Sequence, residues 1–471
     1  MNRNNIWIHI TIATVLITLA AVLGQIRRWE NSLNKHTETI INTSGVGTRA
    51  EYAATPEVNV KFRPGISLTR IKQIASINND RVDDEIESVN GLVFIDDLDN
   101  ADAEAVAAEY SRMTDLVVYA EVNGQISLDD PTDFVSRNDL VDRGGSQAAP
   151  NDPDFDQQYA LNNIGQDGGK QGADISALEA WLKTRGSDKI VVAVLDTGVD
   201  YSHVDLRSNM WLRPDSLPEY FDDELGTFND EFGYNGVEQA SDPMDDNGHG
   251  THCSGIIGAE GDNNEGIAGI NWNVQIMPLK FLGRGGFGST ADAIKAINYA
   301  IDRKKKGVNL RVINASWGST QNSKALKDAI SAAGDAGILF VAAAGNNAGD
   351  NDRRPHYPSN YDLPNVLSVA ATDRNDMLTS FSNYGLKAVH IAAPGRDIES
   401  TWLGDAYRDA SGTSMAAPHV AGVAALILSS EPNLSVKALR ARILDSVDKL
   451  PALTGKVSSG GRLNAAKALE K

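Results

Sequence analysis

Residues 189–200 read KIVVAVLDTGVD, a run of β-branched and apolar residues that ends in an aspartate and a glycine-containing turn. Four similar apolar runs follow: VQIMPLKFL at 274–282, LRVINASW at 310–317, GILFVAAA at 337–344 and NVLSVAA at 365–371. Segments with helical spacing separate several of them, for example 290–304 and 323–335. Apolar strands that alternate with helices are typical of a parallel sheet covered on both faces. We therefore predict an α/β unit of three layers within residues 151–471.

The chain before this unit divides into four segments. Residues 1–24 contain an almost wholly apolar stretch followed by two arginines, which indicates a signal peptide or, alternatively, a retained membrane anchor. Residues 25–55 show no sustained period and are interpreted as a tether. Residues 56–128 alternate strand and helix patterns and predict a small α+β domain of the split βαβ type. Residues 129–150 are rich in Asp, Ser, Asn and Gly and predict a linker open to proteolysis.

Composition narrows the functional class. The 471 residues carry 43 Lys+Arg against 63 Asp+Glu, for a formal net charge of -20. This balance argues against binding to nucleic acid or to anionic membranes, because phosphate groups are neutralised by clustered Lys and Arg. The single cysteine, Cys253, excludes an internal disulfide framework and a four-thiolate metal site. The acidic residues concentrate between Asp205 and Asp262, which favours bound cations in that segment.

Four polar residues stand where strands end or apolar helices begin. Asp196 ends the first strand and Asn346 follows the strand at 337–344, while His249 in DDNGHGTHCSG and Ser414 in SGTSMAAPHVAGVAALIL each precede an apolar helix. A serine becomes an effective nucleophile when an imidazole accepts its proton and a carboxylate orients that imidazole. An asparagine amide can donate to an oxyanion, and a helix N-terminus favours negative charge. Each residue alone also fits a turn or a cap; together they indicate nucleophilic hydrolysis.

The stretches VAVLDTGVDYSHVDL, DDNGHGTHCSG, VINASWGS, VAAAGNN and SGTSMAAPHVAG resemble the subtilisin-like serine proteases, or subtilases. The GHGTHC form is most similar to the thermitase branch. The resemblance covers about 150–471 and implies a subtilisin-like fold and serine endopeptidase activity. It also implies that Asp196, His249 and Ser414 form the catalytic triad, with Asn346 and the backbone N–H of Ser414 as oxyanion donors.

The small domain at 56–128 resembles the propeptide of this family, with YAEVN near its end. The resemblance implies a self-processing zymogen whose small domain assists folding and occupies the cleft until it is cleaved off. We expect polypeptide substrates, the chain's own propeptide as an intramolecular partner, and a monomer. The expected location is extracellular, either as a secreted protein or attached to a membrane by its N-terminal segment.

Two extended segments match those between which a family substrate lies as an added strand. They are Gly286, Phe287 and Gly288 in one, and Ser316, Trp317 and Gly318 in the other. Main-chain pairing of this kind gives affinity without strong sequence preference. Trp317 stands where the family usually has a smaller aliphatic residue, so that it either narrows the primary pocket or packs in its wall. The acidic flank of the histidine motif, Asp245 and Asp246, favours basic residues near the cut bond.

Calcium is the cofactor that the resemblance implies, bound by hard oxygen ligands. The matching positions are Asp152 in NDPDF, Asp205 in SHVDL, and Asn263 with the carbonyl of Ile267 in the loop GDNNEGIAG, which is one residue longer than usual. A long acidic insertion precedes the histidine motif. Its carboxylates Asp222, Asp223 and Asp230 either hold a further ion or belong to a solvated acidic loop.

Rival interpretations rest on single motifs. The glycines at 283–288 fit G-x-G-x-x-G with Asp302 downstream, which favours a nucleotide-binding enzyme. His249 and His252 have the spacing of paired zinc ligands but lack the glutamate of H-E-x-x-H. Cys253 is expected to be a buried small hydrophobe beside the histidine rather than a nucleophile. A catalytically silent, peptide-binding homologue is a further alternative, against which the complete set of polar residues argues.

Overall fold

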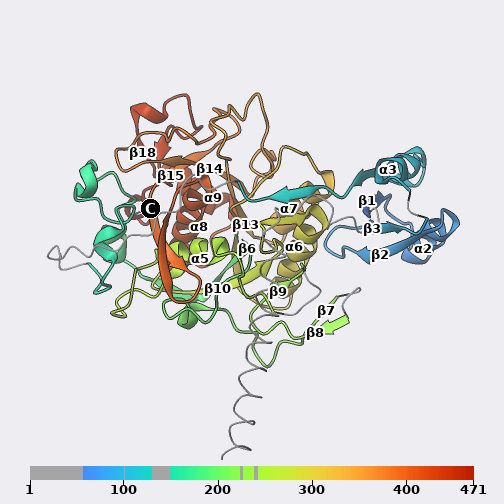
Figure 1. Cartoon of the computed structure of the whole chain (residues 1–471), viewed down its shortest axis with the longest axis horizontal. Coiled ribbons are helices and arrows are strands. Elements are labelled where there is room, and N and C mark those ends of the chain that lie inside the picture. Colours follow the sequence, from blue (N-terminus) through green and yellow to red (C-terminus); the bar gives the residue numbers. More distant parts are fainter. Residues whose placement is uncertain (1–56, 100, 130–148, 223–225, 238–241, 471) are drawn as a thin grey trace, which may run out of the picture. The chain divides into compact units, whose positions relative to one another are not determined.

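The computed structural model describes residues 57–99, 101–129, 149–222, 226–237 and 242–470 (Figure 1). The predicted signal or anchor at 1–24, the tether at 25–55 and most of the linker lie outside these residues.

The small domain is a four-stranded antiparallel sheet, ordered β2-β3-β1-β4, with two helices. Its elements are β1 (Glu57–Phe62), α2 (Leu68–Ile77), β2 (Asp80–Glu85), β3 (Leu92–Asp97), α3 (Ala103–Arg112) and β4 (Val117–Val122). The sequence pattern does not predict β2, because DRVDDE is acidic and lacks an apolar face. This edge strand is held instead through buried Asp80, which accepts a hydrogen bond from the Tyr110 hydroxyl at 2.6 Å. The other five elements follow the predicted order.

The large domain is built on a nine-stranded sheet, ordered β18-β19-β15-β14-β13-β12-β6-β10-β9 (Figure 1). Its strands are β6 (Gly186–Asp196), β9 (Tyr234–Asn235), β10 (Asn273–Lys280), β12 (Leu310–Ala315), β13 (Leu339–Ala343), β14 (Val366–Thr372), β15 (Ile391–Pro394), β18 (Asp448–Lys449) and β19 (Gly461–Arg462). Every neighbouring pair is parallel except β18 and β19. The predicted parallel sheet is therefore confirmed.

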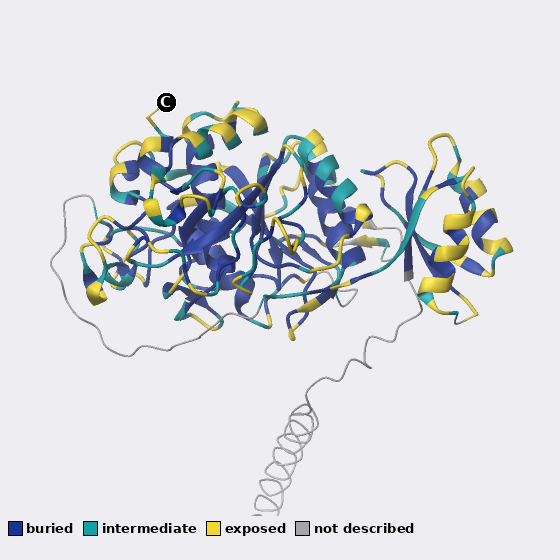
Figure 2. Ribbon diagram, turned by 90° about the horizontal axis from the view of Figure 1, so that it is seen from above, coloured by how far each residue is buried: buried dark blue, intermediate teal, exposed yellow. Residues whose placement is uncertain are grey.

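Helices cover both faces of this sheet, and the alternation of side chains along β6 shows how. Ile190, Val192 and Val194 belong to a buried cluster with residues of α5 (His249–Gly258) and α8 (Thr413–Ser430). Val191, Ala193 and Leu195 point to the opposite face and belong to a cluster with α6 (Thr290–Lys305) and α7 (Lys324–Asp335). The strands between these layers are buried (Figure 2). This arrangement is the predicted three-layer α/β fold.

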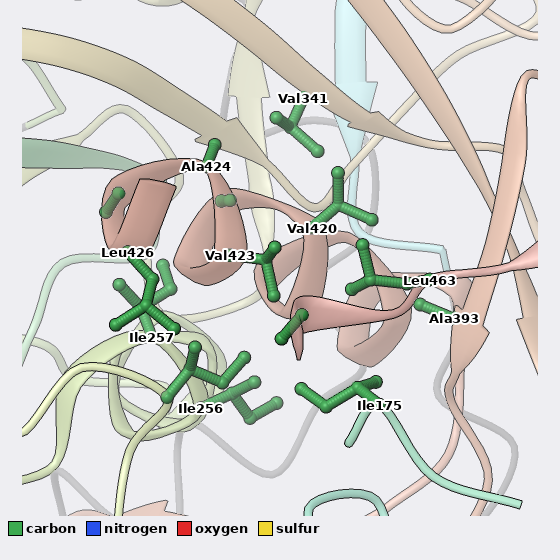
Figure 3. Packing of buried hydrophobic residues seen from close by; sticks show 14 of the residues in the cluster. Ile175, Ile256, Ile257, Val341, Ala393, Val420, Val423, Ala424, Leu426 and Leu463 are labelled. Carbon is green, nitrogen blue, oxygen red and sulfur yellow. The ribbon is translucent and has the colours of Figure 1, made fainter. Parts of the chain in front are cut away.

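Helix α8 forms the centre of one layer. All residues from Thr413 to Leu428 are buried, which explains the apolar composition of the motif. Figure 3 shows Val420 beside Val341 of β13, and Leu426 close to Ile257 of α5. Within the described ranges, α8 alone is long and apolar enough to cross a membrane, but 89% of that window is buried inside the protein. It is therefore a core helix.

Shorter elements complete the fold. They are β5 (Gln125–Ser127), α4 (Ala177–Trp181), β7 (Tyr220–Asp222), β8 (Gly226–Phe228), β11 (Phe287–Ser289), β16 (Ile398–Trp402), β17 (Ala406–Ala410), α9 (Val436–Asp445) and α10 (Ala465–Ala468), with 3-10 turns at Phe155–Gln157, Gln166–Gly168, Arg207–Asn209 and Pro451–Leu453. Because β6, β12 and β13 are parallel neighbours, their carboxyl ends meet at one edge of the sheet. Ligands of such sheets bind beyond that edge.

Candidate active site

Asp196 and His249 form a buried hydrogen-bonded pair. Asp196 is the last residue of β6 and His249 the first of α5, and His249 Nδ1 lies 2.7 Å from Asp196 Oδ1. Neither side chain is more than 1% exposed. Burial lowers the pKa of His249, but the charge of Asp196 and its hydrogen bond outweigh burial, so the pKa is raised above the usual value of 6.5. The other ring nitrogen, Nε2, is buried and has no hydrogen-bond partner among the described residues.

The pair depends on close approach of α5 to the turn after β6. A Cβ on Gly250 would lie 2.1 Å from the carbonyl oxygen of Gly198, so only glycine fits there. Asp245 fixes the start of the helix: it accepts hydrogen bonds from the backbone N–H of Gly248 at 3.0 Å and from the hydroxyl of Thr251 at 2.6 Å. Asp245 is thus an internal capping residue, and Asp246 pairs with Lys280 at 2.6 Å. Neither carboxylate supports the expected preference for basic substrates.

Ser414, the second residue of α8, adjoins this pair. Its hydroxyl donates to the carbonyl of Ser316 at 3.0 Å, and the Ser316 hydroxyl donates back to the Ser414 carbonyl at 2.7 Å. Cys253 connects the two parts: its sulfur lies 3.5 Å from the Ser414 carbonyl oxygen and within 4.8 Å of the ligand atoms of Asp196 and His249. Burial raises the pKa of the Cys253 thiol well above its usual value. The cysteine therefore stays protonated and fits the predicted role of a buried small neighbour.

Asn346 presents an unused amide next to Ser414. Its Oδ1 accepts from the backbone N–H and the hydroxyl of Thr413, each at 2.9 Å, which fixes the orientation of the side chain. Its Nδ2 is buried and has no partner among the described residues. A Cβ placed on Gly412 would lie 3.2 Å from Asn346 Nδ2 and 3.6 Å from the Ser414 backbone nitrogen. Two donors thus flank one small space, as stabilisation of an oxyanion requires.

A strand from the end of the small domain lies against both predicted substrate segments. Strand β5 pairs antiparallel with β11, with Ser127 opposite Phe287 and Ile126 opposite Gly288. The backbone N–H of Leu128 donates to the Gly286 carbonyl at 2.9 Å, and that of Gly318 donates to the Ser127 carbonyl at 3.4 Å. The segment therefore occupies the position expected of a substrate strand.

Trp317 takes the second of its two expected roles. It is fully buried, its indole N–H donates to the Leu195 carbonyl at 2.8 Å, and its ring packs edge-on against Phe281. Trp317 therefore packs in the wall of the predicted primary pocket. Phe287, by contrast, is 46% exposed.

The small domain also caps two helices of the large domain. The Glu121 carboxylate accepts from the backbone N–H groups of Lys324 and Ala325, each at 3.0 Å, at the start of α7. The Asn123 side chain accepts from the backbone N–H of Ala291 at 2.9 Å, at the start of α6. Helix N-termini leave backbone donors unsatisfied and favour negative charge. The two domains therefore stabilise each other at these sites.

The expected calcium ligands come together. Asp205 Oδ2 accepts from the backbone N–H of Ile267 at 3.0 Å and its Oδ1 from the Asn263 amide at 2.8 Å, while Asp152 accepts from the backbone N–H of Asp262 at 2.8 Å. Burial is the largest cause that raises the pKa of Asp205 to about 7 and that of Asp152 to about 6. The two buried carboxylates fit a hard cation such as calcium. The Asn263 amide turns its nitrogen to Asp205, while its oxygen accepts from the backbone N–H of Glu265 at 2.9 Å.

Asp230 has a different role from the one considered. Its carboxylate is fully buried and pairs with Arg213 at 3.0 Å and with Arg303 at 3.1 Å, and it accepts from the Tyr299 hydroxyl at 2.8 Å. Two guanidinium groups already balance the charge of this carboxylate. The structure therefore argues against a cation at Asp230. Asp223 lies outside the described residues, as does the side chain of Asp222.

The rival motifs have structural explanations. The glycines of 283–288 form a tight turn that leads into β11, and Asp302 pairs with Arg303 at 2.6 Å and with Lys306 at 3.0 Å. His252 Nε2 faces the carbonyl oxygens of Ile398 and Arg408 at 3.1 and 3.0 Å. Burial lowers the pKa of His252 to about 3, so it is a neutral core histidine.

Several residues of the site escape the sequence patterns. Thr413 orients Asn346, Asp245 fixes the histidine helix, and Tyr407 places its hydroxyl 3.3 Å from Asp205 Oδ2. His356 lies 3.1 Å from Asp129, next to the substrate segments. Thr413 and Asp245 lie inside the motifs SGTSMAAPHVAG and DDNGHGTHCSG, which could have indicated their roles, although the sequence predicts that Asp245 acts on the substrate instead.

Comparison with known proteins places this geometry in a family. A model of the subtilase family matches residues 187–462. Thermitase of Thermoactinomyces vulgaris is 38% identical over 322 residues, which is 68% of this chain and 99% of thermitase. A thermophilic serine proteinase of Bacillus sp. (strain AK1) is 40% identical over 290 residues, or 62% of this chain and 64% of that protein. Subtilisin-like protease 2 of Plasmodium falciparum is 40% identical over 260 residues, but the match spans only 18% of its length. The chain belongs to the subtilase family.

Proposed function

We propose that the protein is a serine endopeptidase in which Asp196, His249 and Ser414 form the triad and Asn346 donates to the oxyanion. The observation that carries the proposal is the buried Asp196–His249 hydrogen bond of 2.7 Å beside a serine at a helix N-terminus. His249 Nε2 is the acceptor available to the serine proton, since Nδ1 is engaged by Asp196. The arrangement has all the parts that acyl transfer needs.

In the proposed reaction, Ser414 Oγ attacks the substrate carbonyl carbon and its proton passes to His249 Nε2. The carbonyl oxygen becomes negative between Asn346 Nδ2 and the Ser414 backbone N–H. Collapse breaks the C–N bond, and the leaving amine takes the proton from His249. Water then hydrolyses the acyl-enzyme by the same route. Asp196 keeps the imidazole oriented and stabilises its charged form.

The small domain is proposed as an inhibitory propeptide. Strand β5 pairs with both predicted substrate segments, and Glu121 and Asn123 hold the domain on α7 and α6. The chain would thus be a zymogen that matures by cutting its own backbone after the small domain. With its apolar N-terminus at 1–24, we propose that it is exported, as a secreted monomer or with a membrane anchor, and acts on polypeptides.

Calcium is proposed as a structural cofactor at Asp152, Asp205, Asn263 and the carbonyl of Ile267. A divalent cation there would neutralise two buried carboxylates for which no basic partner is found among the described residues. In this proposal the ion stabilises the loop that carries Asn263 and takes no part in catalysis.

The full chain and its Ser414→Ala variant test the proposal. The wild type is expected to shorten itself, to hydrolyse casein and to label with a fluorophosphonate; the variant should stay full-length and do none of these. A matched control is Ser411→Ala, close to the site but outside the triad. Equal processing by wild type and Ser414→Ala, with no casein hydrolysis by either, contradicts the proposal and favours a silent peptide-binding homologue.

A further inference from the structure

The register of β5 determines which residue reaches Ser414. Ser127 lies opposite Gly318 in an antiparallel bridge. In an antiparallel pair, each step forward on one chain is a step backward on the other. Asp129 therefore lies opposite Ser316, whose carbonyl accepts the Ser414 hydroxyl at 3.0 Å. By this register Asp129 takes the position of the residue whose carbonyl group the proposed nucleophile Ser414 would attack, which is the P1 position of a substrate.

The side chain of Asp129 enters a buried site that contains a histidine. Asp129 Oδ1 lies 3.1 Å from His356 Nε2. The exposed fractions of the two side chains are 12% for Asp129 and 4% for His356. A contact between an acid and an imidazole at this depth is a strong, directional interaction, because water screens it little.

The His356 ring forms part of the wall of this site. A Cβ on Gly318 would lie 1.9 Å from its Cε1, and a Cβ on Gly345 would lie 3.1 Å from its Cδ2. Gly318 belongs to a substrate segment, and Gly345 directly precedes Asn346. The ring therefore lies between the segment that pairs with the substrate backbone and the strand end that carries the proposed oxyanion donor.

The backbone around His356 keeps the ring in place. The His356 N–H donates to the Asn360 side chain at 3.0 Å, and the Ser359 hydroxyl donates to the His356 carbonyl at 2.7 Å. Ser319 and Tyr357 exchange two backbone hydrogen bonds of 2.8 Å, which ties the His356 loop to the substrate segment. A fixed side chain that lines the site can discriminate between substrates; a mobile one would adapt to them.

We propose that His356 makes the enzyme select an acidic residue at P1, aspartate above others, and that the chain processes itself on the carboxyl side of Asp129. This inference rests on the proposed endopeptidase function. A leucine at P1 would leave the buried Nε2 of His356 unpaired. Sites built to hydrogen-bond a substrate group reject analogues that lack it far more strongly than apolar pockets reject extra bulk. A lysine would place a cation against a ring that offers N–H donors.

The processing step is the hydrolysis of one peptide bond. Ser414 Oγ bonds to the Asp129 carbonyl carbon and gives its proton to His249. The bond from that carbon to the following nitrogen breaks, and the nitrogen takes the proton and leaves as an amine. Water then hydrolyses the ester between Ser414 and Asp129. This step releases Asp129 with a free α-carboxylate as the new C-terminus and restores the Ser414 hydroxyl.

Quenched peptides with the sequence QISLDDPT, taken from residues 125–132, test the selectivity. The first Asp, which corresponds to Asp129, is replaced in turn by Glu, Asn, Leu and Lys, and kcat/KM is measured with the self-processed wild type. We expect Asp to exceed Asn and Leu by about tenfold or more, with Glu between them, in line with a charge-assisted contact in a buried site. Equal rates for Asp, Asn and Leu overturn the proposal.

Variants of the full chain test the partner residues. Asp129→Leu and His356→Leu should each slow self-processing, and the double variant should recover it, because an apolar P1 residue then meets an apolar wall. His356→Gln keeps a side chain that can both donate and accept a hydrogen bond, so it guards against a folding defect and should cut Asp and Asn peptides about equally. Retained Asp preference in both His356 variants contradicts the proposal.

The experiments distinguish loss of the endopeptidase function from a different role of His356. If no peptide is cut and Ser414 does not label with a fluorophosphonate, the endopeptidase function itself is wrong. If peptides with an apolar or basic P1 residue are cut best, the endopeptidase function stands and the proposed role of His356 is wrong. The same conclusion follows if mass spectrometry places the mature N-terminus away from residue 130 and His356→Leu keeps the selectivity of the wild type.

Discussion

Asp196 Oδ1 lies 2.7 Å from His249 Nδ1, with both side chains buried at the carboxyl edge of the sheet. This contact determines the tautomer of the imidazole, since a proton on Nδ1 leaves Nε2 free to accept. It also sets the acid–base behaviour of the site, because Asp196 raises the pKa of His249 against the effect of burial.

The first prediction concerns pH. His249 must be neutral to accept the serine proton, so kcat/KM should fall as pH decreases through a pKa above 6.5, the usual value. Asp196→Asn should move this acidic limb to lower pH and reduce kcat by about 10⁴, as for triad aspartates generally. The pH profile of peptide hydrolysis measures both. An acidic limb that Asp196→Asn leaves in place would contradict the role of the pair.

The second prediction concerns Asn346. Asn346→Asp keeps the oxygen that accepts from Thr413 but replaces the donor Nδ2 with a second oxygen. We expect kcat to fall by about 10² to 10³, the range measured for the equivalent donor in subtilisin, with little change in KM. Asn347→Ala, at the exposed neighbour, is the matched control. A loss confined to KM would show that Asn346 acts in binding instead.

The third prediction concerns the interface between the two domains. Glu121→Ala, made in the Ser414→Ala chain that we expect not to process itself, removes the acceptor of the Lys324 and Ala325 amides at the start of α7 and leaves the N-cap Ser323 in place. Loss of a cap costs about 0.5 to 2 kcal/mol, so amide hydrogen exchange at Lys324 and Ala325 should speed up by about tenfold. Glu109→Ala, at an exposed position of α3, is the control. Unchanged exchange at both amides would mean that the cap contributes nothing to the stability of α7.

Much of the site follows from the sequence because its backbone is regular. Apolar runs predict the parallel strands, and a parallel sheet places the residues after β6, β12 and β13 at one edge. Asp196 and Asn346 are therefore predicted neighbours before any distance is known. His249 and Ser414 begin apolar helices, whose buried faces must pack on that same sheet.

What the sequence does not predict depends on register and on loops. Asp129 and His356 meet only because β5 pairs with β11 in one register, and no periodicity encodes a contact between residues so far apart. Strand β2 is missed because its edge position permits acidic side chains. Asp230 resembles a metal ligand in the sequence, and only the fold brings Arg213 and Arg303 to it.

The fourth prediction links calcium to pH. Without the cation, Asp205 and Asp152 have pKa values raised to about 7 and about 6, so the folded protein binds more protons than the unfolded chain between the usual aspartate pKa of 3.8 and these raised values. The contribution of these groups to stability therefore falls as pH rises through this range. Calcium at the proposed site would bind the ionised carboxylates and reverse that loss. We expect saturating calcium to raise Tm by about 5 °C or more at pH 8, and by less at pH 5.

Scanning calorimetry with calcium or with EDTA measures the shift of Tm. Asp205→Asn should abolish this shift, and Asp215→Asn, at an exposed position, should not. Equal shifts of Tm at both pH values would mean that calcium binds at another site. No shift at either pH would mean that the protein binds no stabilising calcium.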